Sequence, residues 1–341
     1  MSPPVAVALS GGVDSLVSAA LLAKEGREVF GVHFLTRASP AGEIDPLRRA
    51  AGLLGITLFV EDLTEAFERR VIAPFADEYA AGRTPNPCVM CNARIKFGVL
   101  LDRAKALGAD FLATGHYARV EAGEGGARLF RGADSAKDQS YFLALVERER
   151  LASALFPLAR LTKAEVRSMA LRLGIAPLVK PESQDVCFVP DGGYRAFLEA
   201  RGMAPKPGPV TDSAGRVLGM HRGLFAHTVG QRRGLGIPAA HPYYVLRLAP
   251  EENRLVVGRE EELFSGSAAV SRVNWIIPAP ERALRVSIRA RHRGRLAPAL
   301  LTPLGGGRVR LVFDNPVKAV TPGQAAVFYN GDEVLGGGVF E

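Results

Sequence analysis

The sequence predicts an α/β fold in which a doubly wound parallel sheet comes first and β-rich segments follow. Three observations support this prediction. Residues 1–115 alternate apolar strand-like runs with helical runs, the βαβ pattern of a parallel sheet. A proline-rich stretch at 205–209 marks a change of composition, and beyond 265–267 the pattern is all-β. The chain of 341 residues is also long enough for two or three domains.

The predicted elements follow one another in the order that a βαβ series requires. Residues 5–9 are apolar without a break, as in a strand that is buried on both faces of a parallel sheet. An apolar helical run follows at 16–22. The same patterns predict strands at 28–34, 57–60 and 110–114, helices at 46–54, 65–80, 93–107, 165–173 and 191–201, and a hairpin at 119–120 and 128–131.

The composition indicates a globular protein that does not span a membrane. No apolar run approaches the ~20 residues of a transmembrane helix, and the N-terminus lacks the features of a signal peptide. The odd number of three cysteines argues against a disulfide scaffold and for a reducing compartment, so we expect a cytoplasmic location. The net charge of +8 suggests a polyanionic partner; a generic basic surface is the alternative.

A glycine turn joins the first predicted strand to the first helix. It reads Ser10-Gly11-Gly12-Val13-Asp14-Ser15. Glycines let backbone N–H groups approach a phosphate, and the helix dipole favours negative charge there. The turn lacks the lysine of a Walker A loop and the Gly-x-Gly-x-x-Gly spacing. Because Asp14 would repel a bare phosphate, we expect a nucleotide with Mg²⁺; an ordinary Gly-Gly turn is the alternative.

Residues 82–92 carry two of the three cysteines. Because Pro85 and Pro87 disfavour regular structure, we expect a stiff loop that presents Cys88 and Cys91 just before the helix at 93–107. Helix N-termini lower thiol pKa values, so Cys91 is a candidate reactive thiolate. Three interpretations stay open: a redox or sulfur-carrying thiol, an iron–sulfur or other metal ligand together with Cys187, and an inert buried thiol.

The C-terminal region is basic. Residues 268–341 contain ten Lys/Arg and five Asp/Glu, a net charge of +5. Five arginines have the same parity, so we expect them on one face of a single strand. Such a row suits a phosphodiester backbone, whereas a solvated strand face usually mixes charges of both signs, and we therefore expect contact with RNA or DNA. The five are Arg285, Arg289, Arg291, Arg293 and Arg295.

Together these motifs resemble the tRNA-specific 2-thiouridylases of the PP-loop ATP pyrophosphatases, over nearly the whole chain. The resemblance implies a PP-loop ATP-binding catalytic domain at 1–204, a small central mixed α+β domain, mainly β and tRNA-contacting, at 205–263, and a basic β-barrel domain at 264–341. It also implies the reaction. The 2-oxygen of a wobble uridine in tRNA attacks the α-phosphate of ATP, and sulfur then replaces the AMP to give 2-thiouridine, AMP and pyrophosphate.

The resemblance further implies a role for individual residues. Cys187 would carry sulfur as a persulfide, received from a sulfur-donor or sulfur-relay protein, and Cys91 would release it as sulfide or resolve a disulfide with Cys187. ATP, with Mg²⁺ near Asp14, would bind Ala8, Leu9, Ser10, Gly11, Gly12, Val13, Asp14, Ser15, Phe34 and Gly115. The target base would touch Asn86, Pro87 and Cys88. The tRNA would touch His116, Lys137, Asp138, Gln139, Arg291, His292 and Gln324.

One departure from the family pattern opens an alternative mechanism. The family often has aspartate where this chain has Cys88. The extra thiol leaves the choice between Cys88 and Cys91 open, and with Cys187 it completes a set of three that could hold a [4Fe–4S] cluster.

Two other functions are weighed against tRNA thiolation. A small-molecule PP-loop ligase or amidotransferase would need neither the basic β domain nor the cysteines. An RNA-binding protein with a vestigial nucleotide site is opposed by the retained Asp14, Ser10 and Ser15.

Overall fold

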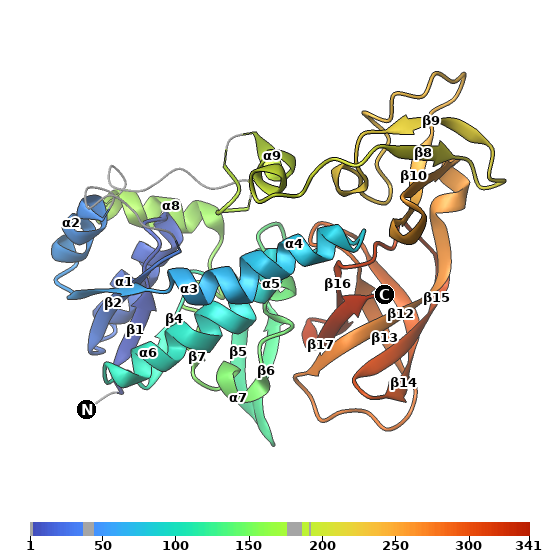
Figure 1. Cartoon of the computed structure of the whole chain (residues 1–341). Helices are drawn as coiled ribbons and strands as arrows, with labels where there is room; N and C mark the ends of the chain where they lie inside the picture. Colours follow the sequence, from blue (N-terminus) through green and yellow to red (C-terminus); the bar gives the residue numbers. More distant parts are fainter. Residues whose placement is uncertain (1–2, 37–43, 176–185, 191) are drawn as a thin grey trace.

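A parallel sheet forms the centre of the N-terminal half in the computed structural model, which describes residues 3–36, 44–175, 186–190 and 192–341 (Figure 1). Five strands pair in the order β3-β2-β1-β4-β7, and all the pairings are parallel. The predicted doubly wound α/β fold is confirmed. The strands are β1 (Val5–Ala8), β2 (Val29–Leu35), β3 (Leu58–Asp62), β4 (Phe111–Ala113) and β7 (Ala154–Leu155).

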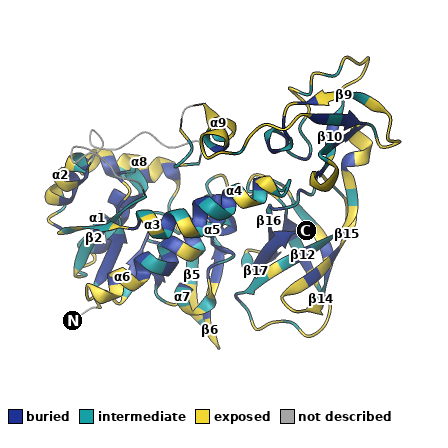
Figure 2. Ribbon diagram, viewed as in Figure 1, coloured by how far each residue is buried: buried dark blue, intermediate teal, exposed yellow. Residues whose placement is uncertain are grey.

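Helices cover both faces of this sheet, because alternate side chains of each strand point to opposite sides. Val5 and Val7 of β1 belong to one buried cluster with side chains of α1, α2 and α8, and Ala6 belongs to another with side chains of the opposite layer. Figure 2 colours the buried residues of the sheet and of these helices dark blue. The first layer contains α1 (Val13–Lys24), α2 (Asp45–Leu53) and α8 (Lys163–Arg172). The second contains α3 (Thr64–Phe67), η2 (Glu68–Ile72), α4 (Ala73–Ala80), α5 (Pro87–Cys91), η3 (Asn92–Leu100) and α6 (Leu101–Ala106).

The helix that carries two cysteines begins earlier than the sequence predicted. We expected residues 82–92 to be an irregular loop, but α5 begins at Pro87 and runs on into η3, with a kink at Gly98 before α6, which ends at Ala106. Proline is well suited to the first helical position, where its missing N–H has no partner to lose. The side chain of Asn86 caps the helix by accepting a hydrogen bond of 3.4 Å from the N–H of Val89. Cys88 and Cys91 are therefore helical residues, three positions apart on one face.

Two β structures follow the sheet domain. A four-stranded sheet has the order β10-β11-β8-β9, from β8 (Gly208–Thr211), β9 (Val217–His221), β10 (Tyr244–Ala249) and β11 (Arg254–Gly258). The C-terminal strands close into a six-stranded barrel because β12 pairs with both β15 and β17. Its strands are β12 (Phe264–Trp275), β13 (Leu284–Arg289), β14 (Leu296–Gly305), β15 (Arg308–Lys318), β16 (Ala325–Asn330) and β17 (Glu333–Phe340).

The barrel is joined to the N-terminal half by a hairpin. The predicted hairpin forms as β5 (Ala118–Gly123) and β6 (Gly126–Arg131), and β6 pairs with β17 of the barrel. Arg128 donates two hydrogen bonds of 2.7 and 2.8 Å to the carboxylate of Glu333 across this seam. The remaining short helices are η4 (Ser140–Leu143), α7 (Arg148–Leu151), α9 (Gly193–Ala200), η6 (Leu224–Ala226), η7 (Pro250–Glu252) and η8 (Glu260–Leu263).

The prediction that five arginines line one face of a single strand is wrong. Strand β13 ends at Arg289, and the chain then turns before β14 begins at Leu296. Arg289 is buried and donates a 3.0 Å hydrogen bond to Asp138, while Arg285 is paired with Asp314. The parity argument failed because it assumed that one strand continues through Arg295.

Among the described residues, no helix is long and apolar enough to cross a membrane.

Candidate active site

The glycine turn lies between β1 and α1, where the sequence placed it. Gly11 has a φ of +80°, which only glycine adopts easily, and Ser15 donates a 2.9 Å hydrogen bond from its hydroxyl to the carbonyl of Gly12. Ser10 accepts a 3.3 Å hydrogen bond from the N–H of Gly12. Within the described ranges, no side chain caps the N-terminus of α1. Its first N–H groups are therefore available to an anion such as a phosphate.

Two predicted ATP-binding residues come from the strands on either side of β1. Phe34 lies near the end of β2, and Gly115 follows β4, so both are at the carboxyl edge of the sheet. A Cβ atom on Gly115 would lie 2.8 Å from the backbone carbon of Asp14 and 2.9 Å from the nitrogen of Ser15. The backbone at Gly115 is therefore packed directly against the start of α1.

This close approach predicts the effect of a single methyl group. We expect Gly115→Ala to weaken ATP binding by about tenfold or more, because the new Cβ would displace Asp14 and Ser15 from the loop. Nucleotide titration followed by calorimetry measures this. The matched control is Gly52→Ala on α2, where a Cβ meets no atom within 4 Å. Equal ATP affinity in the two variants would contradict the packing argument.

A lysine that the sequence analysis missed completes the loop. Nζ of Lys163 lies 2.8 and 2.7 Å from the two carboxylate oxygens of Asp14, and the hydroxyl of Tyr117 donates a 2.8 Å hydrogen bond to the same carboxylate. The Lys163 side chain is only 9% exposed. Thr162 and Glu165 form a capping box that starts α8 at Lys163. This capping sequence locates a helix start, but it does not reveal that the helix reaches the glycine turn.

The Lys163–Asp14 pair changes the expected electrostatics of the loop. From the sequence we expected Mg²⁺ to screen the repulsion between the Asp14 carboxylate and a phosphate. In the structure the ammonium group of Lys163 already offsets the negative charge of Asp14. A carboxylate beside a phosphate-binding turn still has the chemistry of a Mg²⁺ ligand when the ion arrives with the nucleotide. Asp14 would hold such an ion, which would supply positive charge at the phosphates.

Cys88 and Cys91 lie on α5 in the second helical layer, and Cys187 lies in the segment 186–190, which packs beside that layer. All three are free thiols; Cys88 and Cys187 are exposed and Cys91 is half-buried. The ring of Phe188, next to Cys187, packs 5.7 Å from Phe67 and 5.2 Å from Phe75 between ring centres. Although part of Cys88 is exposed to solvent, desolvation by the surrounding protein raises the pKa of its thiol, and the nearby Cys187 raises it further. Thiols from residues 88, 91 and 187 thus share one environment.

The expectation of an acidic Cys91 thiol is wrong in this structure. Burial raises the pKa of Cys91 to about 12, and Cys187 and Cys88 add to the rise, while the positive charge of Lys96 opposes it. Cys91 is the last residue of α5, and the helix continues beyond it through η3. The dipole argument applied to a helix start at Ala93, but the helix begins six residues earlier, at Pro87.

The charge of Lys96 links these thiols to the edge of the nucleotide site. It acts on the pKa of Cys88, Cys91 and Cys187, and it also acts on His116. The ring of His116 lies 6.4 Å from that of Phe97, the residue after Lys96. His116 directly follows Gly115, which packs against Asp14. The helical segment that follows Cys88 and Cys91 therefore reaches the backbone that packs against the glycine turn.

Removing the charge of Lys96 tests this electrostatic link. We expect Lys96→Met to slow alkylation of Cys91 by iodoacetamide about three- to tenfold, because the thiol pKa rises further and less thiolate forms. In the wild type, the alkylation rate should rise about tenfold per pH unit between pH 7 and 9. Arg94→Met, an exposed cation on the same helix, is the control. Equal slowing in both variants would refute a specific role for Lys96.

A [4Fe–4S] cluster is not matched by this arrangement. Among the residues that the structure describes, no group of three or more Cys, His, Asp or Glu side chains is placed to hold a metal ion. The three thiols share an environment without converging as ligands. The cluster therefore stays an alternative prediction.

The predicted tRNA residues on the hairpin side form a network within the protein. His116 is buried, its Nδ1 lies 2.7 Å from the hydroxyl of Thr114, and burial with the charge of Lys96 holds its pKa well below the usual value. Gln139 accepts a 3.0 Å hydrogen bond from the N–H of Tyr117 and donates one of 2.9 Å to its carbonyl. Asp138 is 3% exposed and accepts hydrogen bonds from Arg131 and Arg289. Lys137 is half-buried in the same loop.

The predicted tRNA residues on the barrel lie in two places. The ring of His292 packs 4.3 Å from that of Phe142, and burial together with Arg289 and Arg293 lowers its pKa. Arg291 is exposed along part of its side chain while its Nη2 donates to neighbouring protein oxygens. Gln324 donates a 2.8 Å hydrogen bond to the carbonyl of Thr84. The tRNA contacts of all seven residues stay predictions, as do the ATP and target-base contacts and the domain boundaries.

Comparison with known proteins assigns all three parts of the chain. Residues 3–191 match the family described as tRNA methyl transferase HUP domain, residues 195–259 its PRC-barrel domain, and residues 265–340 an aminomethyltransferase beta-barrel domain. Among solved structures, a crystal structure of a 4-thiouridine synthetase–RNA complex with bound ATP has a TM-score of 0.38 at 19% identity. It covers 55% of this chain and 45% of that chain, and a score this low supports no inference.

Curated relatives are much more similar. A tRNA-specific 2-thiouridylase MnmA from Geobacter metallireducens is 48% identical, over 98% of this chain and 95% of the relative. The protein of the same name from Moorella thermoacetica is 47% identical, over 98% of both chains. Identity at this level over the full length, together with the matched domains, shows that the chain belongs to the tRNA-specific 2-thiouridylase family.

Proposed function

We propose that this protein is an ATP-dependent tRNA sulfurtransferase that converts the wobble uridine of its tRNA substrates to 2-thiouridine. The observation that carries the proposal is the shared neighbourhood of the nucleotide loop and the thiols. Gly115 packs on Asp14, and the ring of the adjacent His116 lies 6.4 Å from that of Phe97, which follows Cys88 and Cys91 on the next helical turns. Membership of the family supports the same conclusion.

The nucleotide loop serves the first step. The N–H groups at the start of α1 and the hydroxyls of Ser10 and Ser15 would hold the β- and γ-phosphates of ATP. Lys163 would add the positive charge that the turn itself lacks. The 2-oxygen of the uridine attacks the α-phosphorus, pyrophosphate leaves, and the oxygen becomes part of an AMP ester. A poor leaving group on C2 is thereby replaced by a good one.

The thiols serve the second step. Cys187 receives a sulfane sulfur from a persulfide donor protein and becomes a persulfide, whose terminal sulfur attacks C2 and displaces AMP. The thiolate of Cys91 then attacks Sγ of Cys187 and breaks the sulfur–sulfur bond. The 2-thiouridine leaves, and a Cys91–Cys187 disulfide forms. The two electrons that reduce the sulfane sulfur come from these thiols, so a dithiol reductant must restore them after each turnover.

The reaction with tRNA distinguishes this function from its alternatives. With ATP, a persulfide donor and tRNA that has uridine at the wobble position, we expect release of pyrophosphate and formation of 2-thiouridine, measured by chromatography of nucleosides. The same tRNA with cytidine at that position is the control. Pyrophosphate release that does not depend on tRNA would instead favour a small-molecule ligase or amidotransferase.

A further inference from the structure

The segment at Thr84 and Pro85, just before the helix that carries Cys88 and Cys91, is hydrogen-bonded to the barrel. The N–H of Thr84 donates a 2.9 Å hydrogen bond to the carbonyl of Pro322. In return, Nε2 of Gln324 donates to the carbonyl of Thr84 at 2.8 Å and to that of Pro85 at 3.4 Å. These two carbonyls come just before Asn86, which caps α5. The barrel therefore holds the chain at the point where this helix begins.

The central β domain is tied to the same place. The hydroxyl of Thr84 donates a 3.2 Å hydrogen bond to the hydroxyl of Thr228. Nη2 of Arg291 donates to the carbonyl of Val229 at 3.3 Å, and to the carbonyl of Ala319 and the hydroxyl of Thr321 at 2.9 Å each. Arg291 thus joins the central domain to the barrel turn 321–324. We call Thr84, Thr228, Arg291 and the turn 321–324 the junction.

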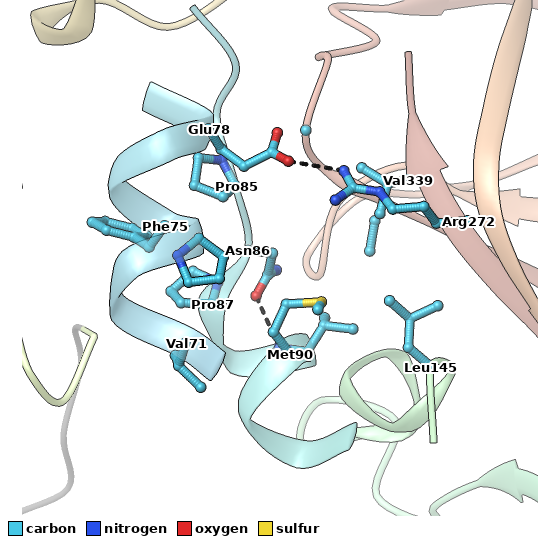
Figure 3. A pocket seen from close by; sticks show the side chains of 14 residues that line it. Val71, Phe75, Glu78, Pro85, Asn86, Pro87, Met90, Leu145, Arg272 and Val339 are labelled. Atoms are coloured by element: carbon cyan, nitrogen blue, oxygen red, sulfur yellow. Dashed lines mark hydrogen bonds and ion pairs between the residues drawn. The ribbon is translucent and has the colours of Figure 1, made fainter. Parts of the chain in front are cut away.

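Close backbone packing makes the junction stiff. Gly323 has a φ of +91°, and a Cβ on it would lie 2.9 Å from the nitrogen of Thr84. Beside it, Arg272 of the barrel donates a 3.0 Å hydrogen bond to Glu78 of α4 across a small apolar cavity (Figure 3). Burial alone would raise the pKa of the Glu78 carboxyl, but Arg83 and Arg272 hold it below its usual value. The cavity of about 40 Å³ has room for a few waters only.

We infer that Gln324 is a positioning residue, which sets the start of α5 and through it the thiols of Cys88 and Cys91. The inference rests on the proposed function and changes one detail of it. The family resemblance assigns Gln324 to a tRNA contact, yet its amide N–H groups are directed at the two carbonyls before α5. Because both β domains meet at this junction, binding of tRNA to either domain can act on the thiol-bearing helix.

The test separates turnover from affinity. We expect Gln324→Leu, which keeps the size but loses the donor, to lower the single-turnover rate of thiolation at saturating tRNA about tenfold to 100-fold. The dissociation constant for tRNA should change less than twofold. Alkylation of Cys88 and Cys91 should become faster, because the start of α5 is no longer held. Asn315→Leu, an exposed amide on β15 of the same barrel, is the matched control.

A second variant keeps the test decisive. Gln324→Lys retains an N–H donor and should recover most of the turnover and the slow alkylation. Weaker tRNA binding by Gln324→Leu, with turnover at saturation and alkylation unchanged, would overturn the inference in favour of an RNA contact. No change in any measurement would also overturn it. If the wild type makes no 2-thiouridine, the proposed function fails, but the alkylation rates still decide whether Gln324 positions the helix.

Discussion

Cys187→Ser is expected to form no detectable 2-thiouridine, a loss of at least about 10³-fold, while tRNA-dependent release of pyrophosphate continues. Serine keeps the size of the side chain but cannot carry a sulfane sulfur. The glycine turn is built from β1, α1 and β4, and Cys187 belongs to none of these elements, so activation of the uridine should survive. Nucleoside chromatography and a pyrophosphate assay on the same reaction measure both steps.

The other two cysteines provide the comparison for this experiment. In the absence of tRNA, Cys91→Ser should accept sulfur on Cys187 and retain it, which mass spectrometry of the intact protein detects as an added sulfur atom. Cys88→Ser should retain more thiolation than either variant if the persulfide route holds. Equal and complete loss in all three variants, together with stoichiometric iron after anaerobic purification, would favour the cluster. Normal thiolation by Cys187→Ser would contradict the assignment outright.

The second large effect is expected at Lys163. Lys163→Met should slow tRNA-dependent pyrophosphate release about 10²- to 10³-fold, because the phosphates lose a cation and the Asp14 carboxylate is left without its partner. The rate of sulfur loading onto Cys187 should not change. A pyrophosphate assay across ATP concentrations measures the effect, and Arg172→Met at the other end of α8 is the control.

A double-mutant cycle with Asp14→Asn isolates the interaction itself. If the two residues act as a pair, the effects of Lys163→Met and Asp14→Asn should be strongly non-additive. Pyrophosphate release by Lys163→Met within twofold of the wild type, in a protein that is still folded, would remove Lys163 from the site.

The features that the sequence predicted correctly are local ones. The strand, the glycine turn and the helix at residues 5–22 are adjacent along the chain, so spacing alone predicts this unit, while the anion site on it stays a prediction. The Lys163–Asp14 pair joins residues 149 positions apart, and no local pattern contains that contact. The hairpin β5–β6 was predicted for the same local reason, whereas its pairing with β17 depends on how distant strands meet.

The wrong predictions came from applying local rules where tertiary structure decides. The helix-dipole rule gave Cys91 an acidic thiol, but the helix begins earlier, at Pro87, and burial raises the thiol pKa. Parity placed five arginines on one strand face, but β13 ends at Arg289, which is buried against Asp138. For Gln324, the family resemblance implied a contact with tRNA. Its hydrogen bonds to the carbonyls of Thr84 and Pro85 instead support a role in positioning the start of α5.

The central claim is that activation by the nucleotide loop and attack by sulfur occur at one uridine carbon. Isotope transfer tests this most directly, with tRNA that carries ¹⁸O at the 2-oxygen of the wobble uridine. After a single turnover, mass spectrometry should find the ¹⁸O in AMP, with one label for each 2-thiouridine formed and none in pyrophosphate. AMP without the label, or formation of ADP and phosphate in place of AMP and pyrophosphate, would contradict the account.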